Sequence, residues 1–406
     1  MRSTKKAVQL PAESLLYPLL FFFGRIILTL ALLPNLQDGV GGLQVYYQWA
    51  DLFDWAFVDY WSEYPPLFPW LNKLVYLLCQ GDYYLFLLVS VLIFSLAGAM
   101  LLVVHSKLSH RFYQPKEANI RDLMLFGLLS VLPYTWWYFD LIPVLLMMLG
   151  LQLLLENKVL ASGFSLAAGI LSKWFPLFVL VAAIRALPGK KALKLSLITL
   201  GMTVLIFGGL YWLSPVNTGA SITALTGRNS YETAWALIDG NMTTGEVFLP
   251  SEHADPAAAA RDTQRGNAAV IPSWLTLPIF GLLGLAAIWK MERSRDHYVI
   301  SLTGITMCVF FIWCSGWSPQ WILFLLPLIT LSFTWNRALL LAGSLIFLTI
   351  LEWPVLLARH IYPALYVIAP LRVILLAVMT YHWVKSLRGT AADSSPLLMP
   401  EETPAL

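Results

Sequence analysis

Carboxylates, cations and aromatic side chains interrupt an otherwise apolar chain, and they are the residues that could do chemistry. A carboxylate can take the proton of a hydroxyl, and cations can offset the charge that develops on a departing phosphate. Aromatic rings can stack on a sugar. This set of residue types would suit transfer of a sugar from a phosphosugar. Candidates lie in segment 35–82 (Asp38, Asp51, Asp54, Asp59, Glu63, Asp82), in segment 214–271 (Arg228, Glu232, Asp239, Glu246, His253) and in shorter turns (Lys173, Gln320, Arg359, His360).

The rest of the chain predicts membrane-embedded helices. Of the 406 residues, 58% are hydrophobic and 12% are charged, whereas soluble proteins average about 25% charged residues. About 20 apolar residues cross a bilayer as a helix. We therefore expect an all-α polytopic membrane protein with about twelve transmembrane helices. The expected spans are 14–34, 83–104, 122–138, 140–155, 159–172, 174–187, 194–213, 272–289, 298–314, 320–334, 337–352 and 364–385.

Basic residues predict the orientation, because cytoplasmic loops carry an excess of Lys and Arg. An even number of spans places both termini on one side, here the cytoplasm. The cytoplasmic segments then hold 18 of the 26 basic residues. The other eight (Arg25, Lys73, Lys173, Arg228, Arg261, Arg265, Arg359, Arg372) lie within spans or on the far side, where basic residues are disfavoured. Since intramembrane charges are often functional, these eight are candidate phosphate ligands. For Arg25, a buried carboxylate or carbonyl partner is the favoured alternative.

Two long segments, 35–82 and 214–271, are expected on the extracytoplasmic side, with interfacial helices such as that predicted near 65–80. Residues 1–390 would form a single transmembrane domain, and 391–406 a disordered cytoplasmic tail. The three cysteines show no metal-binding spacing and are predicted to be buried apolar residues. A net charge of +3 gives no argument for a nucleic-acid partner.

Four short motifs resemble the GT-C class of membrane glycosyltransferases, closest to the bacterial branch that uses polyprenyl-phosphate mannose. They are QVYYQWA at 44–50, EYPPLFPW at 63–70, KWFP at 173–176 and SPQ at 318–320. The resemblance implies an inverting transfer of a hexose, mannose in that branch, from a polyprenyl-phosphate sugar to a lipid-linked or envelope glycan acceptor. It also implies a bacterial plasma membrane, and the scheme needs neither a metal nor another cofactor.

The resemblance further implies that an acid of the first external loop is the catalytic base. The family usually has that acid where this chain has Gly42 or Leu43. We therefore rank Asp51 first, Asp38 second and Glu63 third. The residues expected at the donor are Lys173, Arg228, Gln320, Arg359, His360, Tyr64 and Trp235.

Two questions stay open at the level of sequence. Arg228, Glu232 and Trp235 have helical spacing, which fits either an exposed amphipathic helix with one ion pair or a lid over the sugar site. A multi-pass transporter or lipid flippase is the alternative function, although we find no similarity between the two halves of the chain. A membrane enzyme that moves a preassembled glycan is a weaker alternative.

Overall fold

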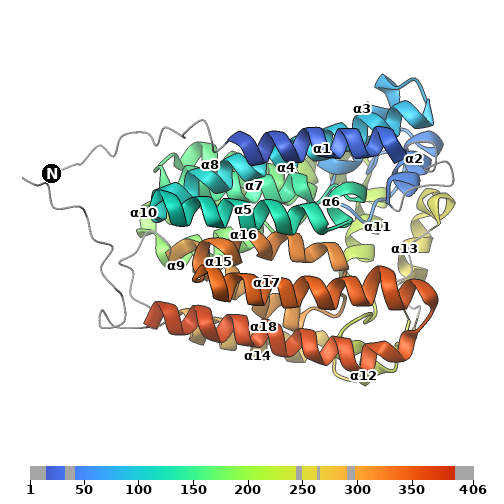
Figure 1. Cartoon of the computed structure of the whole chain (residues 1–406). Helices are drawn as coiled ribbons and strands as arrows, with labels where there is room; N and C mark the ends of the chain where they lie inside the picture. The colour runs from blue at the N-terminus through green and yellow to red at the C-terminus, as the bar shows by residue number, and fades with distance from the viewer. Residues whose placement is uncertain (1–14, 33–41, 244–248, 263–265, 290–297, 389–406) are drawn as a thin grey trace, which may run out of the picture.

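The computed structural model describes residues 15–32, 42–243, 249–262, 266–289 and 298–388 as a bundle of helices (Figure 1). Each of the twelve predicted apolar segments is helical over most of its length. These helices are α1 (Leu16–Leu32), α4 (Tyr83–Phe112), α5 (Pro115–Val131), α7 (Leu141–Leu155), α8 (Val159–Ser172), α9 (Leu177–Ala186), α10 (Gly189–Leu213), α14 (Ser273–Trp289), α15 (Tyr298–Trp313), α16 (Ile322–Ser332), α17 (Trp335–Ile350) and α18 (Leu365–Arg388).

Shorter helices lie between these apolar helices. They are α2 (Gly42–Leu52), α3 (Leu67–Leu78), α6 (Tyr134–Trp137), α11 (Pro215–Thr226), α12 (Ala234–Asp239) and α13 (Pro256–Asp262). Short 3-10 or π turns occur at Pro250–Ala254, Pro319–Trp321, Leu351–Leu356, Leu357–Arg359 and Tyr362–Ala364. The predicted interfacial helix near 65–80 therefore corresponds to α3.

Among the residues that the structure describes, four helical segments are long and apolar enough to cross a membrane: Tyr83–Phe112, Gly189–Leu213, Trp335–Arg359 and Tyr362–Arg388. The remaining apolar helices have 10–17 residues. At 1.5 Å per residue, the ten residues of α9 extend about 15 Å, about half of a typical hydrocarbon layer. The number of complete spans, predicted to be twelve, therefore stays a prediction.

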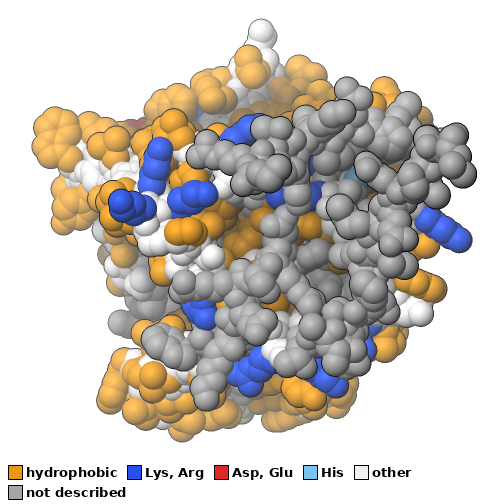
Figure 2. Space-filling view, turned by 90° about the vertical axis from the view of Figure 1, so that its left-hand side faces the viewer, with side chains coloured by type: hydrophobic (Ala, Val, Ile, Leu, Met, Phe, Trp, Pro, Cys, Tyr) orange, Lys and Arg blue, Asp and Glu red, His pale blue; other side chains and the backbone are white. Residues whose placement is uncertain are grey.

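The two ends of the bundle differ in charge. Helix α1 begins and α18 ends at the same end, on the left in Figure 1, and α2, α3 and α13 lie at the other. Figure 2 looks onto the left end, where many Lys and Arg side chains are visible and Asp and Glu are nearly absent from the described atoms. We call this the basic end. The other end carries the carboxylates of segment 42–82 and is called the site end.

Packing in the N-terminal half depends on a close approach of α1 to α4. A Cβ atom added at Gly98 would lie 2.4 Å from the Phe21 ring and 3.1 Å from Leu141, so only glycine fits there. Arg25 of α1 is buried, and its guanidinium donates to the carbonyls of Leu129 (3.0 Å) and Ser130 (3.1 Å) at the end of α5. Arg25 thus has the carbonyl partners that the sequence favoured.

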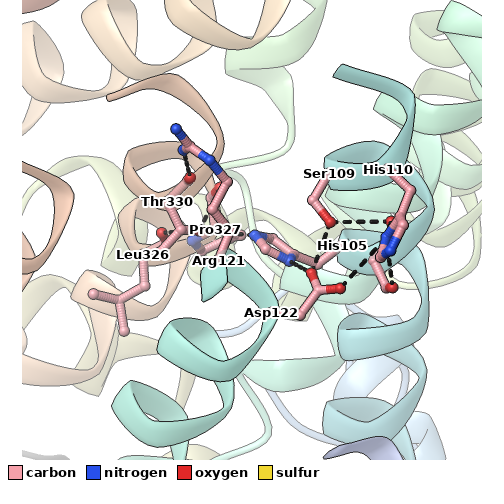
Figure 3. A network of polar contacts seen from close by, with 9 residues as sticks. His105, Ser109, His110, Arg121, Asp122, Leu326, Pro327 and Thr330 are labelled. Atoms are coloured by element: carbon pink, nitrogen blue, oxygen red, sulfur yellow. Dashed lines mark hydrogen bonds and ion pairs between the residues drawn. The ribbon is translucent and has the colours of Figure 1, made fainter. Parts of the chain in front are cut away.

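A buried polar network joins α4, α5 and α16 near the basic end (Figure 3). The Nδ1 atom of His105 lies 2.8 Å from Asp122 Oδ1, and its Nε2 atom lies 2.9 Å from Thr330 Oγ1. Ser109 donates a third hydrogen bond of 2.8 Å to the same Asp122 oxygen. All four side chains are less than 5% exposed, so their polar atoms depend on one another for partners.

Replacing His105 with Leu is expected to destabilise the protein by about 3 kcal/mol, because Asp122 would lose a hydrogen-bond partner while staying buried. The double variant His105→Leu/Asp122→Leu should recover part of the loss. Unfolding in detergent would measure both free energies. Equal stability of the single variant and the wild type would show that the network does not hold the three helices together.

Candidate functional site

An ion pair at the site end joins two segments that are 165 residues apart. The Nη2 atom of Arg228 lies 3.1 Å from Oε2 of Glu63. The Glu63 side chain is 9% exposed and that of Arg228 is 28% exposed, so the pair lies at the surface with the carboxylate turned inward. Two of the residues expected in the site, one as a base and one as a phosphate ligand, are therefore in contact.

Aromatic rings surround Tyr64, the residue after Glu63. Its ring centroid lies 5.3 Å from Phe139, 5.7 Å from Trp49 and 6.5 Å from Tyr46. Helix α2 supplies two of these rings because Leu43, Tyr46, Trp49 and Ala50 lie on its buried face, at helical spacing. The QVYYQWA and EYPPLFPW motifs are thus packed against each other, as a common site would require.

The electrostatics of Tyr64 bring a further carboxylate into this group. Burial raises the pKa of the Tyr64 phenol well above its usual range, and the negative charges of Glu63 and Asp140 raise it further. Arg228 acts in the opposite direction. Burial is also the main reason why the pKa of Tyr46 is raised, and the same two carboxylates raise it further. Glu63 and Asp140 therefore both lie close enough to raise the pKa of the phenols of Tyr46 and Tyr64.

Asp140 is a site residue that the sequence analysis missed. It directly precedes α7 and is completely buried, and its Oδ1 atom lies 2.5 Å from Lys173 Nζ. We had placed Asp140 inside an apolar span, and we had expected Lys173 to bind a lipid phosphate. The missed signal was an acid within a predicted span, which is expensive and commonly functional.

Of the two alternatives left open for Arg228–Trp235, the structure does not show the amphipathic helix. Helix α11 ends at Thr226 and α12 begins at Ala234, and the segment between them pairs with the turn after α15. Tyr231 N donates to Ser315 O (3.1 Å), and Trp317 N donates to Tyr231 O (3.2 Å). Arg228 therefore contacts Glu63 from a segment that is not helical.

A buried ion pair between Arg372 and Glu352 lies against the segment between α11 and α12. Arg372 of α18 contacts the carboxylate of Glu352 and also donates to the backbone carbonyl of Glu232. Its guanidinium lies 4.4 Å from the centroid of the Trp317 ring. The sequence analysis placed Glu352 and Arg372 at or inside apolar spans and did not pair them. Gln320, on the same connection as Trp317, is 8% exposed.

Other predicted site residues have partners away from the Glu63–Arg228 pair. Trp235 donates its indole N–H to Ile312 O (2.9 Å). Arg359 donates to the carbonyls of Pro354 and Val355, and His360 Nδ1 lies 2.8 Å from the Tyr362 hydroxyl, all in exposed positions.

Of the two favoured bases, Asp51 and Asp38, the structure describes only Asp51. Asp51 is exposed and accepts a 2.5 Å hydrogen bond from Tyr76, which raises the pKa of Tyr76 to about 12. Asp38 lies outside the described residues. Of the three carboxylates named as candidate bases, Glu63 alone is described in contact with a predicted phosphate ligand.

The lowered pKa of His253 predicts how the stability of the protein depends on pH. It is buried, stacked on Trp61 with ring centroids 4.4 Å apart, and burial lowers its pKa below the usual value of about 6.5. The unfolded chain then binds a proton near pH 6.5 that the folded protein does not. Stability should be intact above this pH and fall below it, by up to about 1.4 kcal/mol per pH unit.

The matched measurement compares unfolding of the wild type and His253→Gln at pH 7.5 and pH 5.5. The loss on acidification should be smaller in the variant, because glutamine does not titrate. An identical loss in both proteins would contradict this assignment.

Within the described ranges, no group of three or more His, Cys, Asp or Glu side chains could hold a metal ion. Comparison of the chain with protein-family models and with curated proteins found no match.

Proposed function

We propose that this protein is an integral membrane glycosyltransferase that moves a hexose, mannose by the family resemblance, from a polyprenyl-phosphate sugar to a lipid-linked or envelope glycan acceptor. The observation that carries the proposal is the Glu63–Arg228 pair beside the Tyr64 aromatic cluster. The reaction takes place at the site end. By the positive-inside rule the basic end faces the cytoplasm of a bacterial plasma membrane, so the site end is extracytoplasmic.

In this mechanism Glu63 is the general base, and Arg228 binds the phosphate of the donor. The acceptor oxygen loses its proton to Glu63 and forms a bond to the anomeric carbon with inversion. The bond from that carbon to the phosphate oxygen breaks, and polyprenyl phosphate leaves with the bonding electrons. Arg228 stabilises the negative charge that builds on this phosphate.

The ion pair provides a link between donor binding and base activation. While Arg228 contacts Glu63, the guanidinium occupies the carboxylate oxygen Oε2, which is then not free to accept the proton of the acceptor hydroxyl. A phosphate diester competes for the same guanidinium, and planar two-point contacts with phosphate suit arginine. Once Arg228 turns to the phosphate, Glu63 is available for the acceptor hydroxyl.

Binding of the donor tests this proposal. Purified protein should be stabilised by polyprenyl-phosphate sugars, by about 2.7 kcal/mol at a hundred times Kd. Arg228→Ala should lose most of this stabilisation. Arg261→Ala is the control, because Arg261 forms an exposed pair with Asp255 at 2.6 Å. Stabilisation that is equal in wild type and Arg228→Ala would refute the role of Arg228, and none with any sugar lipid would refute the proposed donor.

A transporter or lipid flippase is the second candidate. It is favoured by the buried pairs Asp140–Lys173 and Glu352–Arg372, since charges inside membrane bundles commonly mark transport pathways. Flux of a sugar lipid across proteoliposomes without covalent transfer would support this candidate against the enzyme.

A further inference from the structure

Three buried polar atoms near Tyr64 have no hydrogen-bond partner among the described residues: the Tyr46 hydroxyl, Trp49 Nε1 and Asp140 Oδ2. Tyr46 and Trp49 are 2% exposed, and Asp140 is fully buried. A buried polar group without a partner costs about 1–3 kcal/mol, and a charged one costs more. Three such atoms around one aromatic cluster therefore need an explanation.

The surrounding fold satisfies similar groups nearby. Tyr47, next to Tyr46, donates its hydroxyl to Gly81 O at 2.7 Å. Trp70 donates its indole N–H to Ala56 O at 3.1 Å. The Tyr83 hydroxyl, whose ring packs against Tyr47, also has no partner among the described residues. What Tyr46, Trp49 and Asp140 share is their position around Tyr64.

The chemistry of the three atoms is that of a partner with several hydroxyl groups. Trp49 can only donate, the ionised Asp140 can only accept, and the Tyr46 hydroxyl can do both. An anionic ligand does not suit these atoms, because Lys173 already pairs with Asp140 and the ligand would have to share that cation. The Tyr64 ring, with its centroid 5.8 Å from Phe68 and 5.3 Å from Phe139, adds apolar surface to the same cluster. A sugar matches these atoms, because it carries several hydroxyl groups on an apolar ring skeleton.

We propose that Tyr46, Trp49 and Asp140 form a subsite that binds the hydroxyl groups of the transferred sugar. This inference rests on the proposed function and deepens it. Asp140 Oδ2 accepts a hydrogen bond from one sugar hydroxyl, and Trp49 Nε1 donates to another. Lys173 is a positioning residue that holds the Asp140 carboxylate. Tyr64 follows Glu63 directly and contacts both Tyr46 and Trp49, so the subsite adjoins the proposed base.

The test uses Tyr46→Phe and Trp49→Phe, which remove the polar atoms and keep aromatic rings. Without ligand, unfolding of Tyr46→Phe should be unchanged or occur at higher temperature, because a buried group without a partner is removed. Trp49→Phe should lose some stability, because phenylalanine leaves part of the indole volume empty. Affinity for the polyprenyl-phosphate sugar should fall at least tenfold, while affinity for free polyprenyl phosphate stays the same. Tyr47→Phe and Trp70→Phe are the controls; they should lose stability and keep the affinity for the sugar lipid.

Two results would overturn the subsite. Loss of stability in Tyr46→Phe, as in Tyr47→Phe, would mean that the Tyr46 hydroxyl binds structural water. Unchanged affinity for the sugar lipid would mean that they do not touch the sugar.

An octyl mannoside, which has no phosphate, separates the two proposals. If the wild type binds it and the two variants bind it at least tenfold more weakly, the subsite stands even where the phosphosugar donor fails. If the wild type binds neither probe, both proposals fall.

Discussion

Replacing Glu63 with Gln is expected to reduce sugar transfer by about 10²–10⁴-fold, the usual contribution of a positioned general base. Glutamine has nearly the same shape but cannot take the proton of the acceptor hydroxyl. Stability should change little, because Arg228 is 28% exposed and can be solvated when its carboxylate partner is neutral. Donor binding should persist or become tighter, since Arg228 no longer has to leave Glu63. Initial rates of transfer and donor affinity, measured on the same preparation, check both parts.

Asp51→Asn is the matched control for this prediction. Asp51 is exposed and bonded to Tyr76, so its variant should retain most of the transfer activity. If Asp51→Asn abolished transfer and Glu63→Gln did not, the base would be Asp51, the residue that the sequence ranked first. If neither variant changed the rate, the base would lie elsewhere.

Replacing Lys173 with Met is expected to have the largest effect on stability, a loss of about 3–5 kcal/mol. The methionine fills the volume of the lysine stem but leaves Asp140 as a buried charge without its cation. Asp140 is completely buried, so water cannot replace the ammonium group without a change in packing. Unfolding in detergent, monitored by tryptophan fluorescence, would measure the loss.

The double variant Lys173→Met/Asp140→Leu separates stability from function. Removing both charges should restore much of the stability, because a buried ion pair adds little over apolar packing. Sugar binding should not return, since the carboxylate that accepts the sugar hydroxyl is gone. A double variant that is stable and binds sugar normally would show that the pair is purely structural.

The sequence predicted the helices well because long apolar runs leave few alternatives. The segment that deviated most was 122–138, where helix α5 instead covers Pro115–Val131. Proline favours the first turn of a helix, and Pro115 lies there; Pro133 follows the end of the same helix. The apolar content of the sequence located the helix, whereas the two prolines determined where it begins and ends.

The site was less predictable because its partners come from distant segments. Arg228 and Glu232 have the spacing of a helical ion pair, but Glu232 has a φ of +53° and the segment pairs with residues 315–317 instead. Asp140 and Arg372 looked like isolated charges in apolar runs. Their partners, Lys173 and Glu352, are known only once the helices are packed.

Transfer of a labelled sugar is the most direct test of the central proposal. Proteoliposomes that contain the purified protein would receive polyprenyl-phosphate mannose with a radiolabelled sugar and a lipid extract as the source of acceptor. The account predicts that the label moves to a new lipid or glycan product in the presence of wild-type protein and at least a hundredfold more slowly with Glu63→Gln. Label that remains on polyprenyl phosphate, whether or not it crosses the membrane, would contradict a glycosyltransferase.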